Sequence, residues 1–417
     1  MGHGPSMPCV NPRRAPGSRH RVDVMIRLGA LVLLLLLHGC GVTEGPLLTT
    51  RPAPPTPRPV PLLLAWGAPA PRTAADLTDV ARVWSQGPAF DGVVLSPGVD
   101  APWQSAPLDV APALALEANL AQPPFLGLRG NLLSTRMGPG SVDDDDDTGF
   151  AQVTANFGAL ARAARRIGAR GLMLDTQTYD RQLFSFAAVG RGRAFETVQA
   201  SMRRRGEAVM RAMQAEHPDG LVVVTLGYAD VFRSVCLDGV SLETERYGLL
   251  PAFLDGMRDA LGPGRERQLV DGFLPSYATR DGRAFSTLRS AIVFDEAALR
   301  AGTGAAVSYR FPRQAGEADE FPWRTMEPLR CSEAVRSQLA RTVGVGFGVM
   351  VDFKSEPFDA APYSRNFHSP EGFTEVLSAA RREADSIVWL FSAQVDWWSR
   401  SGRTPLPPAY RAAFTAP

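Results

Sequence analysis

TANFGALARAARRIGARGLMLDTQTYD, residues 154–180, is the stretch that decides the fold. Its first part, 154–167, has the alternation of apolar and polar side chains that is typical of an amphipathic helix. Its next part, 171–175, is a short apolar run that ends at Asp175. A helix followed by a buried strand with a polar end is the unit from which parallel α/β sheets are built.

The same alternation extends in both directions from this stretch. Short apolar runs predict strands at 61–66, 90–95, 125–128, 171–175, 221–227, 270–275, 345–351 and 387–391. Amphipathic segments predict helices at 74–85, 154–167, 194–217, 249–261, 284–300, 332–343 and 370–384. Eight such units favour an α/β fold of the (β/α)8 (TIM) barrel type over an open, doubly wound sheet. No glycine-rich phosphate loop follows any of these strands, so the sequence lacks the main signature of a nucleotide-binding sheet.

Length and charge limit the possible classes of protein. A chain of 417 residues that is 45% hydrophobic is long enough for one large barrel. The formal net charge of +1 argues against a nucleic-acid partner, because such binders normally carry a marked basic excess. We therefore expect no nucleic acid.

The first forty residues have the pattern of an export signal. Five arginines precede an unbroken apolar run at 28–37, which is too short to span a bilayer but matches the core of a signal peptide. The segment from Leu37 to Cys40 resembles a bacterial lipobox, in which the cysteine is lipidated and becomes the first mature residue. Residues 1–40 are therefore predicted to be a signal peptide, with Met1 or Met25 as the start. The resemblance, together with Gly41, implies a lipid anchor at Cys40 in the cell envelope, at the outer membrane.

A proline-rich stretch separates this leader from the predicted barrel. Residues 41–60 read GVTEGPLLTTRPAPPTPRPV and predict an extended tether, and residues 61–417 are predicted to form the single large domain. Cys236 and Cys331 are the cysteines of that domain, and in an oxidising compartment they could form one disulfide. The sequence leaves that pairing and the oligomeric state open.

Polar and aromatic side chains follow the predicted strands at the end where chemistry occurs in this fold. Carboxylates at such a place can protonate a leaving oxygen and activate water or attack a sugar, while aromatic rings stack on sugar faces. We predict Asp175 and Glu356 as the catalytic pair, with Asp180 and Asp352 in reserve. The predicted carbohydrate contacts are Gln177, Tyr179, Tyr228, Asp230, Tyr277, Lys354, Trp397 and Trp398.

Four segments carry a family resemblance: GLMLDTQTYD, YGLLPAFLDGM, LVDGFLPSY and SIVWLFSAQVDWW. They resemble a group of uncharacterised bacterial proteins described as glycoside hydrolases with a β/α-barrel, over most of residues 61–400. The resemblance implies carbohydrate as the partner. In that group the fourth strand tends to end in Asp-x-Glu-x-Tyr, a pattern also similar to chitinase-like barrels. Here Gln177 stands at the Glu position, and an amide cannot donate a proton as a general acid. Either Asp175, Asp180 or Glu356 takes that role, or the protein binds glycans without cleaving them.

Each site residue also has a structural interpretation. Asp175 could hydrogen-bond backbone at the barrel rim, Trp397 and Trp398 could cap the core, and the three tyrosines could pack at the rim. The acidic run 143–147 lacks the spaced ligands and glycine of a calcium loop, so we predict a solvated turn and no metal. No cofactor is predicted, and no Gly-x-Ser-x-Gly elbow occurs. Two hypotheses remain: a glycosidase, or a catalytically inactive, envelope-anchored glycan-binding or scaffold protein.

Overall fold

The structure is a computed structural model. It describes residues 60–415, except 68–69, 139, 179–181, 295–330, 340–342, 354, 356 and 360. The predicted signal peptide at 1–40, the site at Cys40 and nearly all of the tether at 41–60 lie outside the described residues. The barrel lies in a compact unit that spans Arg58–Pro417.

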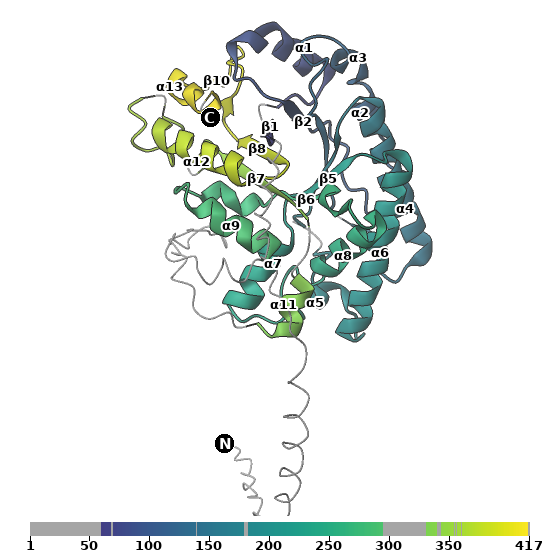
Figure 1. Ribbon diagram of the computed structural model, residues 1–417. Helices are drawn as coiled ribbons and strands as arrows, with labels where there is room; N and C mark the ends of the chain where they lie inside the picture. Colours follow the sequence, from purple (N-terminus) through teal and green to yellow (C-terminus); the bar gives the residue numbers. More distant parts are fainter. Residues whose placement is uncertain are drawn as a thin grey trace, which may run out of the picture. The chain divides into compact units, whose positions relative to one another are not determined.

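Eight parallel strands close into a barrel in the order β1 to β8, and β8 pairs with β1. The strands are β1 Leu62–Gly67, β2 Gly92–Leu95, β3 Leu132–Arg136, β4 Gly171–Asp175, β5 Leu221–Val224, β6 Leu269–Asp271, β7 Gly344–Met350 and β8 Ile387–Ser392. Figure 1 shows the strands at the centre with helices around them. The predicted (β/α)8 barrel is confirmed.

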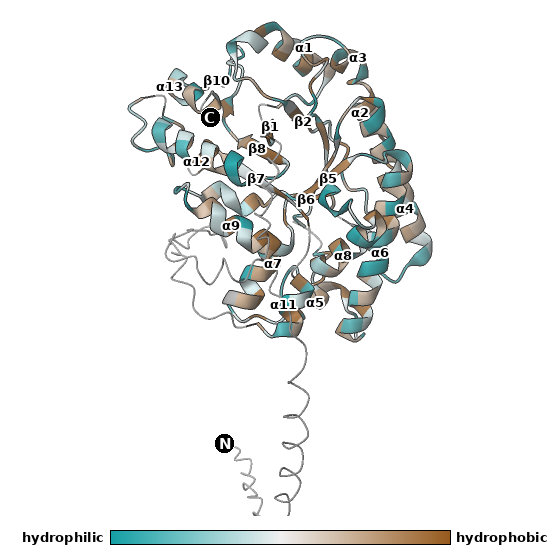
Figure 2. Ribbon diagram, in the orientation of Figure 1, coloured by the Kyte–Doolittle hydropathy of each residue, from teal (hydrophilic) through white to brown (hydrophobic). Residues whose placement is uncertain are grey.

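Helices cover the outside of the barrel. The longer ones are α1 Ala74–Val83, α4 Asp147–Arg166, α6 Phe195–Glu216, α8 Leu250–Leu261, α9 Ala284–Val293 and α12 Pro370–Glu383. The shorter helical segments are η1 Trp84–Gln86, α2 Ala111–Leu114, α3 Glu117–Leu120, α5 Phe186–Val189, α7 Tyr228–Phe232, η2 Arg233–Leu237, η3 Glu266–Gln268, η4 Leu274–Ala278, α11 Glu333–Leu339, α13 Pro408–Arg411 and η5 Ala412–Phe414. The strands β9 Val395–Asp396 and β10 Thr404–Pro405 form a small separate sheet. Figure 2 shows the hydrophobic colouring gathered on the strands, while the helices carry hydrophilic stretches.

Side-chain caps fix where three of the long helices begin. Thr73 and Asp76 form a capping box at α1, the carboxylate of Asp146 accepts from Gly149 N at α4, and Ser369 accepts from Gly372 N at α12. These contacts satisfy N–H groups that have no partner inside the helix. None of the described helices combines the length and the apolar character needed to cross a bilayer.

Trp389 fills the inside of the barrel. Leu64 on β1 and Gly348 on β7 are its register partners, and its indole Nε1 donates to the backbone oxygen of Gly272 at 2.9 Å, just past β6. A bond that reaches from β8 to the end of β6 shows that the ring lies in the interior. Because side chains alternate along each strand, this register also places Met173, Asp175 and Trp66 on the inward face.

Several predicted elements need correction. Residues 125–128 form turns and not a strand, and the third strand is Leu132–Arg136. The apolar run that continues past Val224 is divided, because Gly227 is the N-cap of α7, and the run after Asp271 becomes η4. Helix α4 begins at Asp147, seven residues before the predicted start, since the acidic run supplies its cap. Helix α9 ends at Val293, and most of the remainder of the predicted helix 284–300 lies outside the described residues.

The acidic run is held by two arginines of the segment before α6, Arg191 and Arg193, and by Arg205 of α6. Asp144 is buried and accepts two bonds from Arg193, at 2.6 and 2.9 Å. Asp143, Asp145 and Asp147 also pair with arginines, and Asp146 caps α4. The prediction of a solvated turn is therefore confirmed for Asp145, Asp146 and Asp147, which are exposed, and is wrong for Asp144, which is buried against Arg193.

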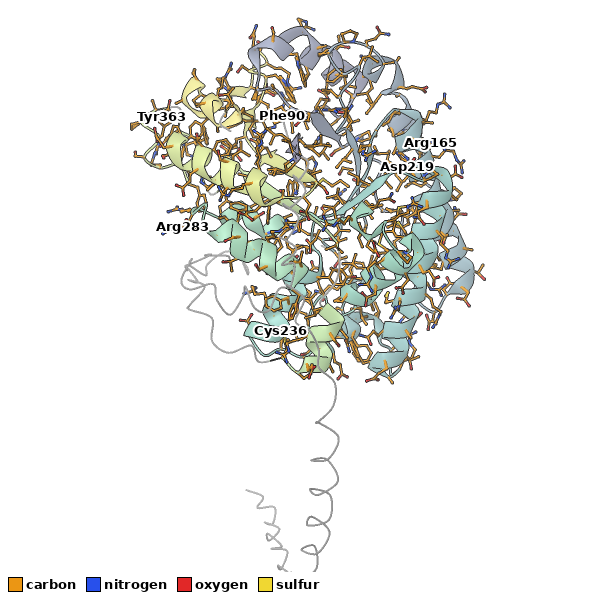
Figure 3. All side chains as sticks on the ribbon, in the orientation of Figure 1. Phe90, Arg165, Asp219, Cys236, Arg283 and Tyr363 are labelled. Carbon is orange, nitrogen blue, oxygen red and sulfur yellow. A yellow bond between two sulfur atoms is a disulfide. The ribbon has the colours of Figure 1, made fainter. Side chains whose placement is uncertain are left out.

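A disulfide joins Cys236 in η2 to Cys331, just before α11. Figure 3 labels Cys236 at this place. The bond connects two segments that are 95 residues apart in the sequence. It resolves the pairing that the sequence left open.

Candidate active site

The inward side chains at the ends of β3 and β4 begin a polar site at the mouth of the barrel. Asp175 is the last residue of β4, and Arg136, the last residue of β3, is its register partner. Thr225 directly follows β5, and its hydroxyl lies 3.0 Å from Asp175 Oδ1. The residues that precede these positions in each strand are mostly apolar and lie in the core. Each polar side chain therefore lies at the end of its strand, where the core ends.

Asp175 is a buried carboxyl group whose surroundings favour its neutral form. Its side chain is 7% exposed, and Oδ1 accepts the backbone N–H of Gln177 at 3.1 Å and the hydroxyl of Thr225 at 3.0 Å. Burial raises the pKa of Asp175 to about 6, although those two hydrogen bonds and the charge of Arg136 pull it down. The carboxylate of Asp100 adds a smaller upward contribution to this pKa. A carboxyl group of this kind can carry a proton close to neutral pH.

Arg136 and Asp100 form an ion pair beside this acid. The Arg136 guanidinium donates to Asp100 Oδ2 at 2.8 and 3.1 Å, and the Arg136 backbone N–H donates to Asp100 Oδ1 at 3.0 Å. The pair remains partly exposed, so its charges and donors face the solvent at the barrel mouth. The pair supplies a positively charged donor and a negatively charged acceptor, and both charges influence the pKa of Asp175.

An aromatic cluster lies at the ends of β1 and β8 and in η4, which follows β6. Trp66 at the end of β1 and Tyr277 in η4 both contact the buried Trp389 edge-on, with ring centroids 4.9 Å apart in each case. Phe391 on β8 completes the cluster, at 5.4 Å from Trp66 and stacked at 5.6 Å on Tyr277. Trp66, Tyr277 and Phe391 are each partly exposed, whereas Trp389 below them is not. Because β8 and β4 are four strands apart in a closed ring of eight, Phe391 lies across the barrel from Asp175, whereas Trp66 and Tyr277 come from β1 and from the segment after β6.

Asp352 is placed in the structure of the β7–β8 corner. It is 1% exposed, and its carboxylate accepts from the Ser392 hydroxyl at 2.7 Å and from three successive backbone N–H groups, those of Ala393, Gln394 and Val395. A carboxylate that accepts from four donors ties the turn after β8 to the end of β7. The structure therefore gives this predicted reserve acid a positioning task.

Trp397 and Trp398 lie in the core. Both are 0% exposed; Trp398 stacks on Trp84 with ring centroids 5.5 Å apart, and Trp397 packs edge-on against Phe90. Neither ring has a face open to a sugar. Trp397 and Trp398 therefore cap the core, which is the structural interpretation that the sequence also allowed. Tyr228 is also buried, and its hydroxyl donates to Asp255 at 2.9 Å.

Asp230 and Asp271 form a second acidic pair, behind the barrel wall. Asp271 alternates with the inward Val270, so it faces α7, where it accepts from the N–H groups of Phe273 at 3.1 Å and Ala229 at 3.5 Å. Burial raises the pKa of Asp271 to about 6. Burial, together with the charge of Asp271, raises the pKa of Asp230 well above its usual value. The pair anchors the first turn of α7, and the predicted substrate contact at Asp230 therefore lies at the start of this helix.

Of the remaining predicted residues, Gln177 and Tyr277 lie at the mouth and are partly exposed. Tyr179, Asp180, Lys354 and Glu356 lie outside the described residues. Within the described ranges, no three His, Cys, Asp or Glu side chains gather closely enough to hold a metal ion.

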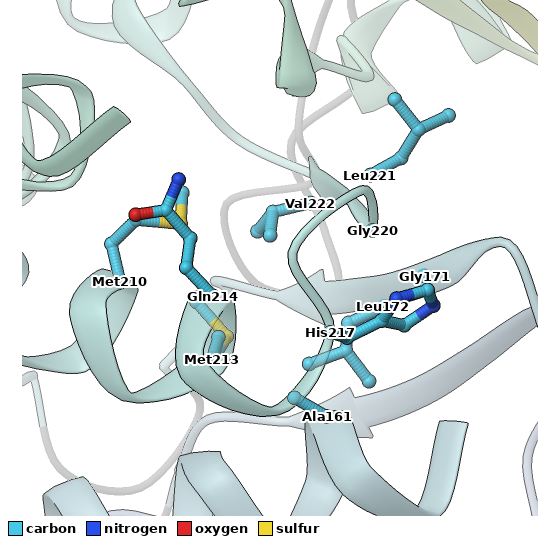
Figure 4. A pocket seen from close by; sticks show the side chains of 10 residues that line it. All are labelled: Ala161, Gly171, Leu172, Met210, Met213, Gln214, His217, Gly220, Leu221 and Val222. Atoms are coloured by element: carbon cyan, nitrogen blue, oxygen red, sulfur yellow. The ribbon is translucent and has the colours of Figure 1, made fainter. Parts of the chain in front are cut away.

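A small cavity lies at the other end of the barrel strands (Figure 4). It has a volume of about 10 Å³ and is lined by the first residues of β4 and β5 together with residues of α4 and α6, among them Gly171, Leu221, Met213 and Gln214. That volume suits a single water molecule and no sugar ring. The cavity is therefore distinct from the site at the mouth.

Comparison with solved structures gives likenesses at low sequence identity. No known family and no curated protein matches the chain. Solved structures that it resembles include a glycoside hydrolase family 5 enzyme from Prevotella bryantii B14, at 13% identity over 84% of this chain and 88% of that one, with a TM-score of 0.42. A GH5_18 protein from Streptomyces cattleya, in complex with GlcNAc, matches at 13% identity over 86% and 80% of the two chains, with a TM-score of 0.44. A GH18 chitinase from Pseudoalteromonas aurantia matches at 8% identity over 80% and 93%, with a TM-score of 0.36. Because these likenesses are below 25% identity and below a TM-score of 0.5, the function has to be argued from the chain's own geometry.

Sequence reasoning did not identify Trp66, Asp100, Arg136, Thr225 or Phe391 as members of the site. Placing the third strand at 125–128 removed Arg136 from the list of strand ends. The sequence does carry a signal for Trp66 and Phe391, because each is a large aromatic residue at the last position of a predicted strand. Thr225 lies inside the predicted strand 221–227, whereas β5 ends at Val224.

Proposed function

We propose that this protein is a glycoside hydrolase that acts on a carbohydrate at the carboxyl end of its barrel, with Asp175 as the general acid. One observation carries the proposal: Asp175 is an inward-facing, buried carboxyl group at the end of β4 whose pKa is raised to about 6. An acid with a pKa near the working pH is suited to protonate the leaving oxygen of a glycosidic bond.

The aromatic cluster of Trp66, Tyr277 and Phe391 supplies the second element of the proposal. Its rings are partly exposed, Phe391 lies across the barrel from Asp175, and the cluster offers apolar surfaces on which a sugar ring stacks. Arg136 and Asp100 offer donors and acceptors for hydroxyl groups at the same mouth. Glu356 or Asp180 would be the second carboxylate, as nucleophile or as the base that activates water.

The test is hydrolysis of a broad panel of polysaccharides and aryl glycosides by the full chain. Asp175→Asn keeps the size of the side chain and removes the acidic proton, so it is expected to reduce the rate by a factor of about 100 or more. Asp79→Asn on the exposed face of α1 is the matched control and is expected to keep full activity. Activity that persists in Asp175→Asn would overturn the assignment of Asp175.

Gln177 favours a second candidate function, which is glycan binding without cleavage. It stands where the resembling proteins have Glu, and its backbone N–H is a partner of Asp175. In that case we expect the chain to bind a glycan on an array or in calorimetry, and Trp66→Ala to weaken that binding. Neither the wild type nor Asp175→Asn would hydrolyse any substrate of the panel.

We further propose that the protein is exported and anchored in the cell envelope, at the outer membrane, through a lipid on Cys40. The basic and apolar leader supports this, and so does the disulfide between Cys236 and Cys331, since disulfides persist in oxidising compartments. Metabolic labelling with a palmitate analogue tests it: the label is expected on the wild-type chain and absent from Cys40→Ala. A labelled Cys40→Ala chain, or an unlabelled wild type, would contradict the proposal.

A further inference from the structure

The hydrogen bonds around Asp175 distinguish its two carboxyl oxygens. Both bonds go to Oδ1, which accepts from Gln177 N at 3.1 Å and from the Thr225 hydroxyl at 3.0 Å. Within the part of the chain that the structure describes, Oδ2 of this buried side chain accepts no hydrogen bond. The two oxygens therefore have different tasks.

The direction of the Thr225 hydrogen bond follows from its surroundings. The Thr225 oxygen accepts the backbone N–H of Thr176 at 3.1 Å. The hydroxyl of Thr176 is itself used, because it donates to Leu226 O at 2.9 Å and accepts from Leu226 N at 2.9 Å. Thr176 Oγ1 lies 3.4 Å from Thr225 Oγ1, whereas the carboxylate oxygen of Asp175 lies at 3.0 Å. The single proton of the Thr225 hydroxyl therefore points to Asp175.

We propose that Thr225 is a positioning residue that donates to Oδ1 of Asp175 and thereby places the transferable proton of this acid on Oδ2. Thr225 and Thr176 are both 0% exposed, so no solvent competes for these contacts. The strand register strengthens the arrangement, because β4 and β5 pair directly up to Leu174 and Val224, one residue before Asp175 and Thr225. The backbone thus fixes the distance between the two side chains.

The consequence for proton transfer rests on the proposed function. In that reaction the bond between Oδ2 and its proton breaks, and the proton joins the glycosidic oxygen as the bond between that oxygen and the sugar carbon breaks with its electrons going to the oxygen. Water then forms a bond to that carbon, either directly or by displacing a carboxylate that attacked first, and its released proton passes to the second carboxylate in the first case and back to Asp175 in the second. The negative charge left on Asp175 is stabilised at Oδ1 by two donors that are already in place. The placement of the proton itself does not depend on any substrate.

Thr225→Val tests the proposal because it removes the hydroxyl and keeps the size and branching of the side chain. The readout is the titration of Asp175 followed by the ¹³Cγ signal of the full chain labelled at aspartate, with Asp175→Asn to assign the signal. If Thr225 donates to the ionised oxygen, the midpoint rises by about one pH unit or more in Thr225→Val. Thr225→Ser keeps the donor and returns the midpoint to the wild-type value.

The opposite arrangement gives the opposite sign. If Asp175 carried its proton on Oδ1 and donated it to Thr225, loss of the hydroxyl would lower the midpoint, and a fall or no change would overturn the proposal. Thr374→Val is the matched control, because it removes a hydroxyl that bonds only to Pro370 O on α12, and it leaves the Asp175 midpoint unchanged. Where Thr225→Val fails to fold, Thr225→Ala removes the same donor without a branched side chain and gives the same sign.

The outcome is separable from the proposed function. A raised midpoint in a chain that hydrolyses nothing keeps this inference and removes the glycosidase proposal. Hydrolysis that is lost in Asp175→Asn, with an unmoved midpoint in Thr225→Val, keeps the glycosidase and removes this inference. Where there is activity, the alkaline limb of kcat/KM moves upward in Thr225→Val by the same amount as the midpoint.

Discussion

Trp389 lies directly over Gly348, its register partner on β7. A Cβ added at Gly348 would come within 2.5 Å of Trp389 Cζ2 and within 2.8 Å of Tyr277 Cε1. The inward positions of β7 before Met350 are all glycine, at 344, 346 and 348. Because these three inward positions of β7 have no side chain, the indole of Trp389 can fill the interior and support the aromatic cluster at the mouth.

Gly348→Ala is therefore expected to lower the free energy of unfolding by about 1 to 3 kcal/mol, because the packed indole cannot move away without disturbing its bond to Gly272. Gly158→Ala is the control. The nearest atom to a Cβ added at Gly158, in the middle of α4, would be Ala212 O at 3.7 Å. Gly158→Ala is therefore expected to raise the free energy of unfolding by about 0.5 to 1 kcal/mol. Urea unfolding of both variants measures the difference, and an unchanged midpoint for Gly348→Ala would contradict the tight packing.

Asp175→Asn is expected to stabilise the protein above neutral pH while it removes activity. The pKa of Asp175 in the folded chain is about 6 against 3.8 for the ordinary carboxyl, so the stability that the neutral form provides is present below pH 3.8 and is lost as the pH rises through 6. At pH 8 the variant should be more stable than the wild type by about 2 to 3 kcal/mol, because each tenfold change in proton affinity corresponds to about 1.4 kcal/mol. The gain should vanish near pH 4.

The measurement is the difference in the free energy of unfolding between variant and wild type at pH 4, 6 and 8. Taking differences cancels the contributions of Asp230 and Asp271, whose pKa values are also raised. Asp79→Asn serves as the control because it makes the same change at a carboxylate on the exposed face of α1. A flat profile for Asp175→Asn would show that burial does not favour the neutral acid.

Asp352→Asn should have the opposite effect. Its carboxylate accepts from Ser392 and from the backbone at 393–395, and an amide nitrogen cannot accept any of these bonds. We expect a loss of about 2 to 4 kcal/mol in the free energy of unfolding at pH 7. If the variant kept full stability and lost only hydrolysis, the prediction of Asp352 as a reserve acid would regain its support.

Asp144→Asn tests the acidic run. Asp144 is buried and pairs with Arg193, which is itself mostly covered, so the variant leaves a guanidinium with a weakened partner and should cost about 2 kcal/mol. Asp145→Asn removes an exposed neighbour whose contact with Arg193 is 3.6 Å, and it should change stability by no more than about 0.5 kcal/mol. Added calcium is expected to leave the Tm of the wild type unchanged; a rise would indicate that the run binds the cation.

The barrel was predictable because its strands are apolar runs and its helices are amphipathic segments. The run 171–175 was placed with the bounds that the structure has, since Gly168 and the polar residues after Asp175 delimit it. The third strand was missed because LLSTR at 132–136 has only two apolar residues before its polar end, while FLGL at 125–128 has three. Register with β4 decides that choice, and register is a long-range property.

The candidate site was only partly predictable for a related reason. Sequence places a residue at the end of a strand, and alternation then decides whether it faces the interior, so Asp175 was within reach. That Asp352 would be saturated by backbone donors, or that Trp397 and Trp398 would be covered, depends on how the chain after β8 folds back. Thr225 became visible as a partner of Asp175 only once β4 and β5 were paired.

Loss of the disulfide should weaken the whole domain. The bond closes a loop of 95 residues, and the entropy that it removes from the unfolded chain corresponds to about 4 to 5 kcal/mol. The paired variant Cys236→Ser and Cys331→Ser is expected to lose that amount in urea unfolding under oxidising conditions, and wild type treated with a phosphine reductant should fall to the same level. The reductant should leave the paired variant itself unchanged, which separates the bond from other effects of reduction. Equal stability of oxidised wild type and paired variant would show that the segment around η2 is held by its packing, with Phe232 against Phe294 as the contact to remove next.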